Sequence, residues 1–359
     1  MPKLFLGISG HGYGHLGQIS PLIDALRTAE PELELTVQCG LPREVIASRI
    51  ASPFDHIPTH TDVGMVMSGP LRVEQEASLA AYAAFHADWD RRLEEQTALM
   101  ENAAPDLVLA DVPYLPLAAA QRLGIPSAAV CSLNWEVILR AYCGETAQTR
   151  PWLATMLDAY RNAHIFLRPA PAIPMPELPN AEFIGPLAFR GRDRRQEIDA
   201  RLGLASGTRL VLLTLGGIAG DLPLIEWPHT PGIAWLVDRS RFNGTAAEMY
   251  PLSVLDDLPF WDLLASLDAV VTKPGYGIFT EAACNALPAL YLPRGDWPEE
   301  PFLIPWLEYH GNARAITPEI LAAGALETPL EQLWSLPRKP PVEPTGIAEG
   351  MERLLPLLT

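Results

Sequence analysis

The sequence predicts an α/β protein made of two successive units, each with a parallel β-sheet flanked by helices. Apolar strands alternate with helical segments along most of the chain. Each half opens with a strand followed by a Gly-containing turn, in residues 3–17 and 209–217. The length of 359 residues suits two domains of ordinary size. We therefore expect right-handed crossovers and two sheets whose carboxyl ends face a central cleft.

The first half begins with a βαβ pattern. Residues 3–9 form a short apolar run, residues 10–17 are rich in glycine, and residues 18–30 have helical periodicity before a second strand at 33–39. The other strands expected here are 106–110, 127–131, 164–168 and 181–184, and the helices are 73–102, a segment ending at Leu123, 135–142 and 151–163.

The second half repeats this organisation. A strand at 209–215 ends in Gly216-Gly217, and further strands are expected at 233–237, 248–251, 269–272 and 289–292, with helices at 260–267 and 278–285. We expect a first domain at 1–187, a linker at 188–205, a second domain at 206–342, and a helix within 343–359 that could pack back on the first domain.

Composition excludes several classes of function. The formal net charge is −17 and no stretch is rich in Lys or Arg, so the chain has no electrostatic footprint for nucleic acid or an anionic membrane. No apolar run approaches the ~18 residues of a membrane span. The four cysteines form no C-x-x-C pair and no zinc-finger spacing, which favours a reduced, cytoplasmic protein.

The first Gly-rich turn matches the G-x-G-x-x-G pattern over Gly12, Gly14 and Gly17, after a strand and before a helix. A dinucleotide site also needs an acidic residue at the end of the second strand to hold the ribose. That strand ends at Gln38 and Cys39 with no carboxylate. A nicotinamide or flavin site is therefore disfavoured.

Two histidines flank this turn, His11 and His15. A helix start disfavours protonated imidazole, so His15 would be neutral and suited to general-base work near pH 7. A base needs a partner that orients its second ring nitrogen, and Asp111 directly follows the strand at 106–110. The alternatives are surface histidines and an Asp111 that only caps the next helix.

The stretch from 269 to 308 carries a second candidate site. A strand leads into Lys273, then Gly275 and Gly277, at the start of a helix. Backbone N–H groups at a helix start bind anions, Lys273 adds a positive charge, and glycines let a phosphate approach. Downstream carboxylates, Glu281, Glu299 and Glu300, could accept hydrogen bonds from ribose and sugar hydroxyls. The alternative is an ordinary helix start with solvated side chains.

Gly216-Gly217 offers a further place for backbone N–H groups to meet a diphosphate.

These motifs resemble the GT-B glycosyltransferases, including the plant-type UDP-glycosyltransferases and the transferase that makes lipid II. Gly14-His15 resembles the N-terminal turn, and Gly275 with Glu281 keeps the donor-motif spacing. The runs GHGYGH, LNWEVI and KPGYGIFTEA are most similar to the glycosyltransferase-like N-terminal domain of L-arabinokinases. The resemblance covers most of the chain and is to the part of those proteins that precedes their kinase half.

The resemblance implies roles for individual residues. His15 would be the general base and Asp111 would orient it. Lys273 stands where the plant-type enzymes have a phosphate-binding His, while Ile278 replaces their hydroxyl residue, and Glu299-Glu300 stands in for their Asp/Glu-Gln pair. The residues expected to bind donor are Gly216, Gly217, Val254, Leu255, Lys273, Gly275, Tyr276, Gly277, Ile278, Thr280, Glu281, Glu299 and Glu300; those expected to bind acceptor are His11, Tyr13, Asn134 and Trp135.

The function that this implies is an inverting, metal-independent transferase of the hexosyltransferase type with no cofactor. It would use a nucleotide-sugar donor, a UDP-sugar above others, and a small-molecule or lipid-linked acceptor with a hydroxyl or amine. The alternatives are a sugar-nucleotide epimerase or hydrolase, and a non-catalytic nucleotide-sugar-binding protein.

Overall fold

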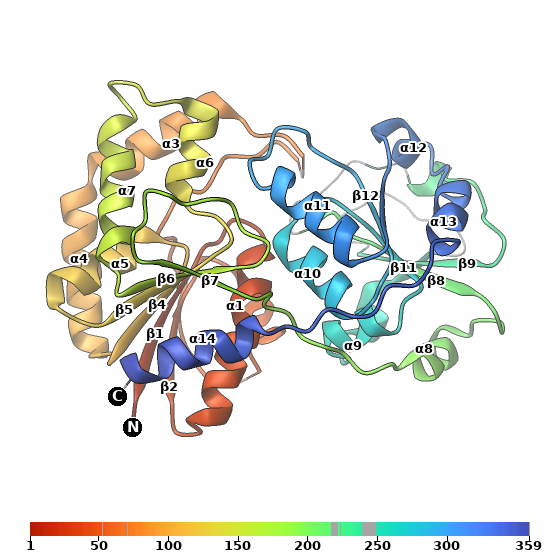
Figure 1. The fold of residues 1–359 in the computed structure, drawn as a ribbon, viewed down its shortest axis with the longest axis horizontal. Helices are drawn as coiled ribbons and strands as arrows, with labels where there is room; N and C mark the ends of the chain where they lie inside the picture. The colour runs from red at the N-terminus through yellow and green to blue at the C-terminus, as the bar shows by residue number, and fades with distance from the viewer. Residues whose placement is uncertain (52, 70, 217–221, 223, 239–248, 359) are drawn as a thin grey trace. The chain divides into compact units, whose positions relative to one another are not determined.

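The computed structural model describes residues 1–51, 53–69, 71–216, 222, 224–238 and 249–358. It contains two compact units (Figure 1). Unit 1 comprises Met1–Ser68, Val73–Leu187 and Thr345–Thr359, and unit 2 comprises Gly69–Arg72 and Ala188–Pro344. The chain therefore passes from unit 1 to unit 2 and returns at its C-terminal end.

Unit 1 is built on a seven-stranded parallel sheet with the order β3-β2-β1-β4-β5-β6-β7. The strands are β1 (Lys3–Ile8), β2 (Glu34–Gln38), β3 (Asp55–Ile57), β4 (Leu107–Asp111), β5 (Ser127–Val130), β6 (Ile165–Pro169) and β7 (Ala181–Ile184). The chain builds outward from β1 to β3 and then reverses to β4, so β1 and β4 are neighbours. Open α/β sheets bind ligands at the carboxyl ends of strands at such a switch point.

The helices of unit 1 are α1 (Gly14–Ala29), α2 (Arg43–Ala47), α3 (Gln75–Ala87), α4 (Trp89–Ala103), α5 (Tyr114–Leu123), α6 (Trp135–Cys143), α7 (Arg150–Asn162) and α14 (Gly346–Leu354), followed by the short η4 (Leu355–Leu357). Two expectations from the sequence were wrong. Helix α1 starts at Gly14 and not at residue 18, so His15 lies inside the helix. The single long helix expected at 73–102 is two helices that meet at Asp88, whose backbone leaves the helical region.

The core of unit 1 explains why these segments fold as they do. Phe5 on β1 and Val108 on β4 are fully buried, and they pack with Met100 of α4 and the alanines of α5. Small side chains on α5, Ala119 and Ala120, let this helix lie close to the sheet. Strands buried on both faces read as continuous apolar runs, which is why β1 and β4 were recognisable in the sequence.

Unit 2 has a six-stranded parallel sheet with the order β10-β9-β8-β11-β12-β13. The strands are β8 (Arg209–Leu213), β9 (Ile233–Val237), β10 (Met249–Pro251), β11 (Ala269–Thr272), β12 (Ala289–Tyr291) and β13 (Ala313–Ala315). The helices are α8 (Arg195–Leu202), α9 (Phe260–Ala265), α10 (Tyr276–Cys284), α11 (Glu300–His310), α12 (Pro318–Ala322) and α13 (Glu327–Trp334), with the short η1 (Leu224–Glu226) and η3 (Leu252–Leu255). Here the switch point lies between β8 and β11.

The C-terminal helix α14 packs in unit 1 against α1, and it crosses that helix in Figure 1. Glycines let α14 approach both the segment that follows β7 and helix α1. A Cβ on Gly346 would lie 2.0 Å from the carbonyl oxygen of Gly185, and a Cβ on Gly350 would lie 3.0 Å from Leu22. Glu349 also accepts a hydrogen bond from the Gly185 amide. Within the described residues, no helix has the length and apolarity needed to cross a membrane.

We expect Gly346→Ala to lower the free energy of unfolding by about 1–3 kcal/mol, because the added methyl meets rigid backbone and not a side chain that can turn aside. Urea denaturation followed by circular dichroism measures this change. Ala348→Ser, at an exposed position of the same helix, is the control and should stay within ~0.5 kcal/mol. Equal stability of Gly346→Ala and the parent would show that this helix contact is looser than described.

Candidate active site

The switch point of unit 1 brings the end of β4 beside the start of α1. Ile8 pairs with Asp111, the last residue of β4, and the Ser9 amide donates to the Asp111 carbonyl at 2.8 Å. The chain then turns through Gly12, whose φ of +76° favours glycine, and α1 begins at Gly14. This places His15 in the first turn of α1, next to the end of β4.

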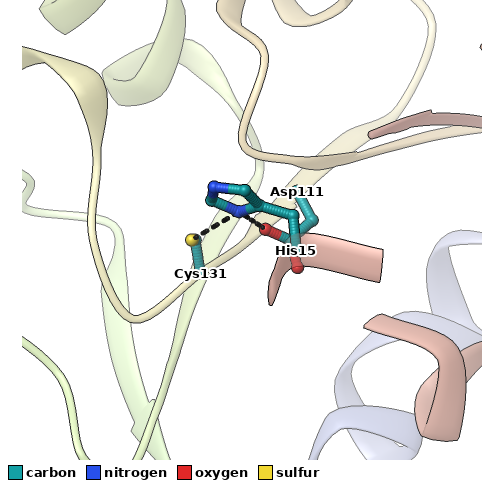
Figure 2. A group of neighbouring side chains, drawn as sticks. All are labelled: His15, Asp111 and Cys131. Carbon is teal, nitrogen blue, oxygen red and sulfur yellow. Dashed lines mark hydrogen bonds and ion pairs between the residues drawn. The ribbon is translucent and has the colours of Figure 1, made fainter. Parts of the chain in front are cut away.

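His15 and Asp111 form a buried hydrogen-bonded pair. Nδ1 of His15 lies 2.8 Å from Oδ1 of Asp111, and the ring points its other nitrogen away from the carboxylate (Figure 2). His15 is 7% exposed and Asp111 is 0% exposed. A carboxylate accepts only, so Nδ1 carries the proton and Nε2 of a neutral ring holds a lone pair. The pairing predicted from the sequence is therefore present as a contact, and the role of His15 as a base stays a prediction.

A second carboxylate, Asp62, lies in the same region and was missed from the sequence. Its Oδ2 accepts a hydrogen bond from the Trp135 indole at 2.6 Å, and the indole ring lies 5.5 Å from the His15 ring and 5.2 Å from the His11 ring. Burial raises the pKa of Asp62, while hydrogen bonds from Ser9 and Trp135 and the nearby His15 act in the opposite direction. Asp62 thus fixes the ring that packs against both histidines.

The residues predicted to bind the acceptor differ in how exposed they are. Tyr13 is 38% exposed at the cap of α1, and His11 has its Nε2 3.0 Å from the Met65 carbonyl. Asn134 is buried and caps α6 by accepting from the Val137 amide at 2.9 Å. Trp135 is fully buried beside His15. Acceptor binding by these four residues stays a prediction, and for Asn134 and Trp135 the contacts favour a supporting role.

The switch point of unit 2 carries the second group of predicted residues. Gly275, the N-cap residue of α10, is in extended conformation and has no side chain with which to cap the helix start. Gly216 has a φ of +83°, and a Cβ built on it would lie 3.3 Å from Cε of Lys273, so the end of β8 and the end of β11 converge here. Gly217, predicted with it, lies outside the described residues.

Lys273 and Arg294 form a pair of confined cations at this point. Burial, followed by the charge of Arg294, lowers the pKa of Lys273 to about 7, against the opposing effect of Glu299 and Glu300. The Arg294 side chain is 4% exposed, donates to the Pro274 carbonyl at 3.3 Å and stacks on Trp297, with Cζ 4.3 Å from the ring centroid. Arg294 follows β12 at the carboxyl edge of the sheet, so the strand-end rule could have found it.

The paired carboxylates predicted to hold a sugar are engaged in local hydrogen bonds. Glu300 accepts from the Arg294 amide at 3.0 Å, from the Gly295 amide at 2.9 Å and from Nε of Arg294 at 3.1 Å. Glu299 accepts from the Trp297 indole at 2.7 Å. Both therefore shape the loop between β12 and α11, and contact of either with a sugar stays a prediction.

The remaining predicted donor residues lie on α10 and η3. Glu281 is 2% exposed one turn into α10, and the Thr280 hydroxyl donates to the Tyr276 carbonyl at 3.0 Å. Tyr276 and Gly277 are buried and Ile278 is half-buried in the first turn. On η3, Val254 is 45% exposed and Leu255 is buried. The backbone amides at 276–278, at the start of α10, are the groups best suited to an anion.

No family model matches this chain. Among curated proteins, it is 27% identical over 310 residues to an L-arabinokinase of Arabidopsis thaliana, a match that covers 84% of this chain and 29% of that protein. The chain thus spans less than a third of that relative. It is also 27% identical over 316 residues to the pyrophosphoryl-undecaprenol N-acetylglucosamine transferase of a Nocardioides species, covering 79% of this chain and 76% of that one.

Solved structures agree on the fold. The glycotransferase of kitacinnamycin superposes with a TM-score of 0.61 at 17% identity, covering 99% of this chain and 96% of that one. A UDP-N-acetylglucosamine 2-epimerase superposes with a TM-score of 0.53 at 14% identity, covering 99% and 96%. The chain has the two-domain GT-B fold, and the resemblance to the GT-B superfamily drawn from the sequence is confirmed.

We expect Lys273→Met to raise the free energy of unfolding at pH 7 by about 1 kcal/mol or more, because burying the ammonium costs more than burying an apolar side chain of similar length. The folded-state pKa is below the unfolded one, so the parent loses stability as pH falls from about 10 towards 7, and the variant should lack that slope.

Urea titrations at pH 7 and pH 9.5 measure both effects, with Lys3→Met as the matched control at a position with an exposed ammonium. A less stable Lys273→Met at pH 7 would contradict the expectation, because it would mean that the folded protein gains from this charge.

Proposed function

We propose that this chain is a glycosyltransferase that moves a sugar from a nucleoside-diphosphate sugar to a hydroxyl or amine acceptor, with inversion at the anomeric carbon. The observation that carries the proposal is the buried pair formed by His15 and Asp111 at 2.8 Å, at the switch point of a GT-B unit. The transferases among the relatives and the similar structures support it.

The proposed chemistry starts at Nε2 of His15. This nitrogen accepts the acceptor proton as the acceptor oxygen or nitrogen forms a bond to the anomeric carbon, and the bond from that carbon to the diphosphate oxygen breaks. Asp111 stabilises the imidazolium that forms, because its carboxylate already accepts the Nδ1 proton. Displacement in one step from the face opposite the leaving group inverts the configuration.

The leaving diphosphate is assigned to the α10 end of unit 2. Backbone amides at the start of α10 and the ammonium of Lys273 offer it hydrogen bonds and positive charge, and the buried Arg294 adds to the local potential. Preorganised cations at a developing anion can replace a divalent metal, so we propose that catalysis needs neither a metal nor another cofactor. Ribose at Glu281 and uracil along Val254 and Leu255 complete the proposed donor site.

The proposed acceptor is a small molecule or a lipid-linked molecule, in line with the names of the similar transferases, one of which acts on pyrophosphoryl-undecaprenol. We propose a reduced, cytoplasmic setting, in which the buried cysteines stay as thiols. The second candidate function is a sugar-nucleotide epimerase, because an epimerase shares this fold. An epimerase converts donor without any acceptor, whereas a transferase turns over only when the acceptor is present.

We expect His15→Ala to lower kcat about 10²–10⁴-fold, the usual contribution of a general base, while the Kd for donor changes less than about twofold. Acceptor-dependent release of nucleoside diphosphate measures turnover, and calorimetry measures donor binding. His229→Ala, an exposed histidine of unit 2, is the control and should keep both values. Full turnover in His15→Ala would refute the role of the base.

We expect the affinity for a UDP-sugar to fall as pH rises above 7, because Lys273 must be protonated to attract the diphosphate and its pKa is about 7 in the free protein. A UDP-sugar is the better probe than UDP, because it has no phosphate proton that titrates in this range. Calorimetry from pH 6 to pH 9 measures the effect.

Lys273→Arg should bind with little dependence on pH, since a guanidinium stays charged. Glu281→Gln should weaken binding at every pH without changing the slope. A pH-independent affinity in the parent would remove Lys273 from the donor site, and the same experiment with dTDP-, GDP- and ADP-sugars identifies the base.

A further inference from the structure

Three different metal-binding side chains meet at the proposed reaction centre. Besides the pair described above, Sγ of Cys131 lies 3.7 Å from Nδ1 of His15, and the ligand atoms of His15, Asp111 and Cys131 all lie within 4.8 Å of one another. Figure 2 shows the thiol and the carboxylate approaching the same ring nitrogen from two sides. The proposed reaction uses the carboxylate and the imidazole but not the thiol.

We propose that His15, Asp111 and Cys131 form a binding site for a soft divalent transition metal of the zinc type, and that the bound ion inhibits the protein. This set of nitrogen, oxygen and sulfur ligands is one that zinc accepts. This site differs from a catalytic metal site, because the ion would coordinate Nδ1 of His15 and the Asp111 carboxylate, the same atoms whose hydrogen bond orients the proposed base.

The fold explains why the three side chains converge. Asp111 ends β4, Cys131 directly follows β5, and these two strands are neighbours in the parallel sheet. The Cys131 amide donates to the Leu167 carbonyl on β6, which fixes its backbone. His15 arrives from the first turn of α1. Two strand ends and one helix start thus hold the ligands on separate, rigid elements, as a specific metal site requires.

The distances suit a tetrahedral ion after a small movement. Bonds of about 2.0–2.1 Å to nitrogen and oxygen and about 2.3 Å to sulfur place tetrahedral ligand atoms roughly 3.3–3.6 Å apart. The observed 3.7 Å between sulfur and nitrogen is close to this, while the 2.8 Å between nitrogen and oxygen has to open by about half an ångström. A rotation of the His15 ring supplies that change, and a water completes the coordination.

Charge also favours the ion at this buried place. Asp111 and Cys131 are both 0% exposed. Zinc binds thiolate and carboxylate, and their two negative charges neutralise the two positive charges of the ion, so no net charge is buried. On binding, the thiol proton leaves to solvent. Mg²⁺ prefers oxygen ligands and keeps its waters, so the site selects against it.

Inhibition follows from the imidazole tautomer, and this step rests on the proposed function. A metal bound at Nδ1 displaces the proton there, and the neutral ring then carries its proton on Nε2. Nε2 becomes a donor and can no longer accept a proton from the acceptor. The ion therefore blocks the base without touching the donor site, and it should lower kcat while donor binding persists.

The test compares the parent with Cys131→Ala and with Cys143→Ala, which removes a buried thiol elsewhere in unit 1. The probes are Zn²⁺ in competition with a chromophoric chelator, and Co²⁺, whose absorption bands report thiolate coordination. We expect one equivalent to bind to the parent and to Cys143→Ala, with thiolate bands for Co²⁺, and at least about tenfold weaker binding to Cys131→Ala without those bands.

In the activity assay, Zn²⁺ should inhibit the parent and a chelator should restore it, while Cys131→Ala keeps its basal activity and resists Zn²⁺. Cys131→Ser serves if the alanine variant does not fold. Equal Zn²⁺ affinity of the parent and Cys131→Ala, or Co²⁺ binding without thiolate bands, would refute the proposal that Cys131 is a metal ligand. The metal titrations decide this even if no transferase activity is found, so failure of the proposed function and failure of the site are distinguishable.

Discussion

The hydrogen bond between His15 Nδ1 and Asp111 Oδ1 is the interaction on which the rest of unit 1 depends for its chemistry. A carboxylate with no exposure to solvent is costly unless a donor meets it, and the imidazole N–H is such a donor. The bond can form only because β1 and β4 are neighbours, which brings the end of one strand beside the helix that follows the other. The same bond decides the tautomer of the ring. The topology of the sheet therefore determines which nitrogen of His15 would act as the base in the proposed reaction.

In unit 2 the buried charges at the switch point include two cations, whereas in unit 1 the fully buried charge is a carboxylate. Lys273 and Arg294 lie together at the start of α10, where the helix dipole is also positive. Glu300 offsets part of this by accepting from the guanidinium and from two backbone amides, and Trp297 covers the face of the guanidinium. What remains is a lysine whose pKa has fallen to about 7. A pKa lowered in this way costs folding stability. A diphosphate bound beside Lys273 would supply negative charge next to the two cations, and we therefore propose a ligand site here.

Much of this arrangement could be predicted from the sequence, and the exceptions have physical reasons. Strand ends gave Asp111 and Lys273, because carboxyl ends of parallel strands lie on one edge of a sheet whatever else the chain does. The same rule also covers Cys131 and Arg294, which follow the carboxyl ends of β5 and β12. Asp62 could not be found in this way, since it lies in an irregular segment and only the tertiary contact with Trp135 gives it a role. The break at Asp88 also carries no stop signal, because neither Gly nor Pro occurs in α3, in α4 or at Asp88 between them.

The most direct test of this account is the tautomer of His15, measured by nitrogen-15 NMR of the histidine rings near pH 7. Comparison with the spectrum of His15→Ala assigns the resonance. The account predicts a neutral ring protonated at Nδ1, with Nε2 unprotonated, as the contact with Asp111 requires. A neutral ring protonated at Nε2 would contradict it, because His15 would then present a donor where the proposed reaction needs a base.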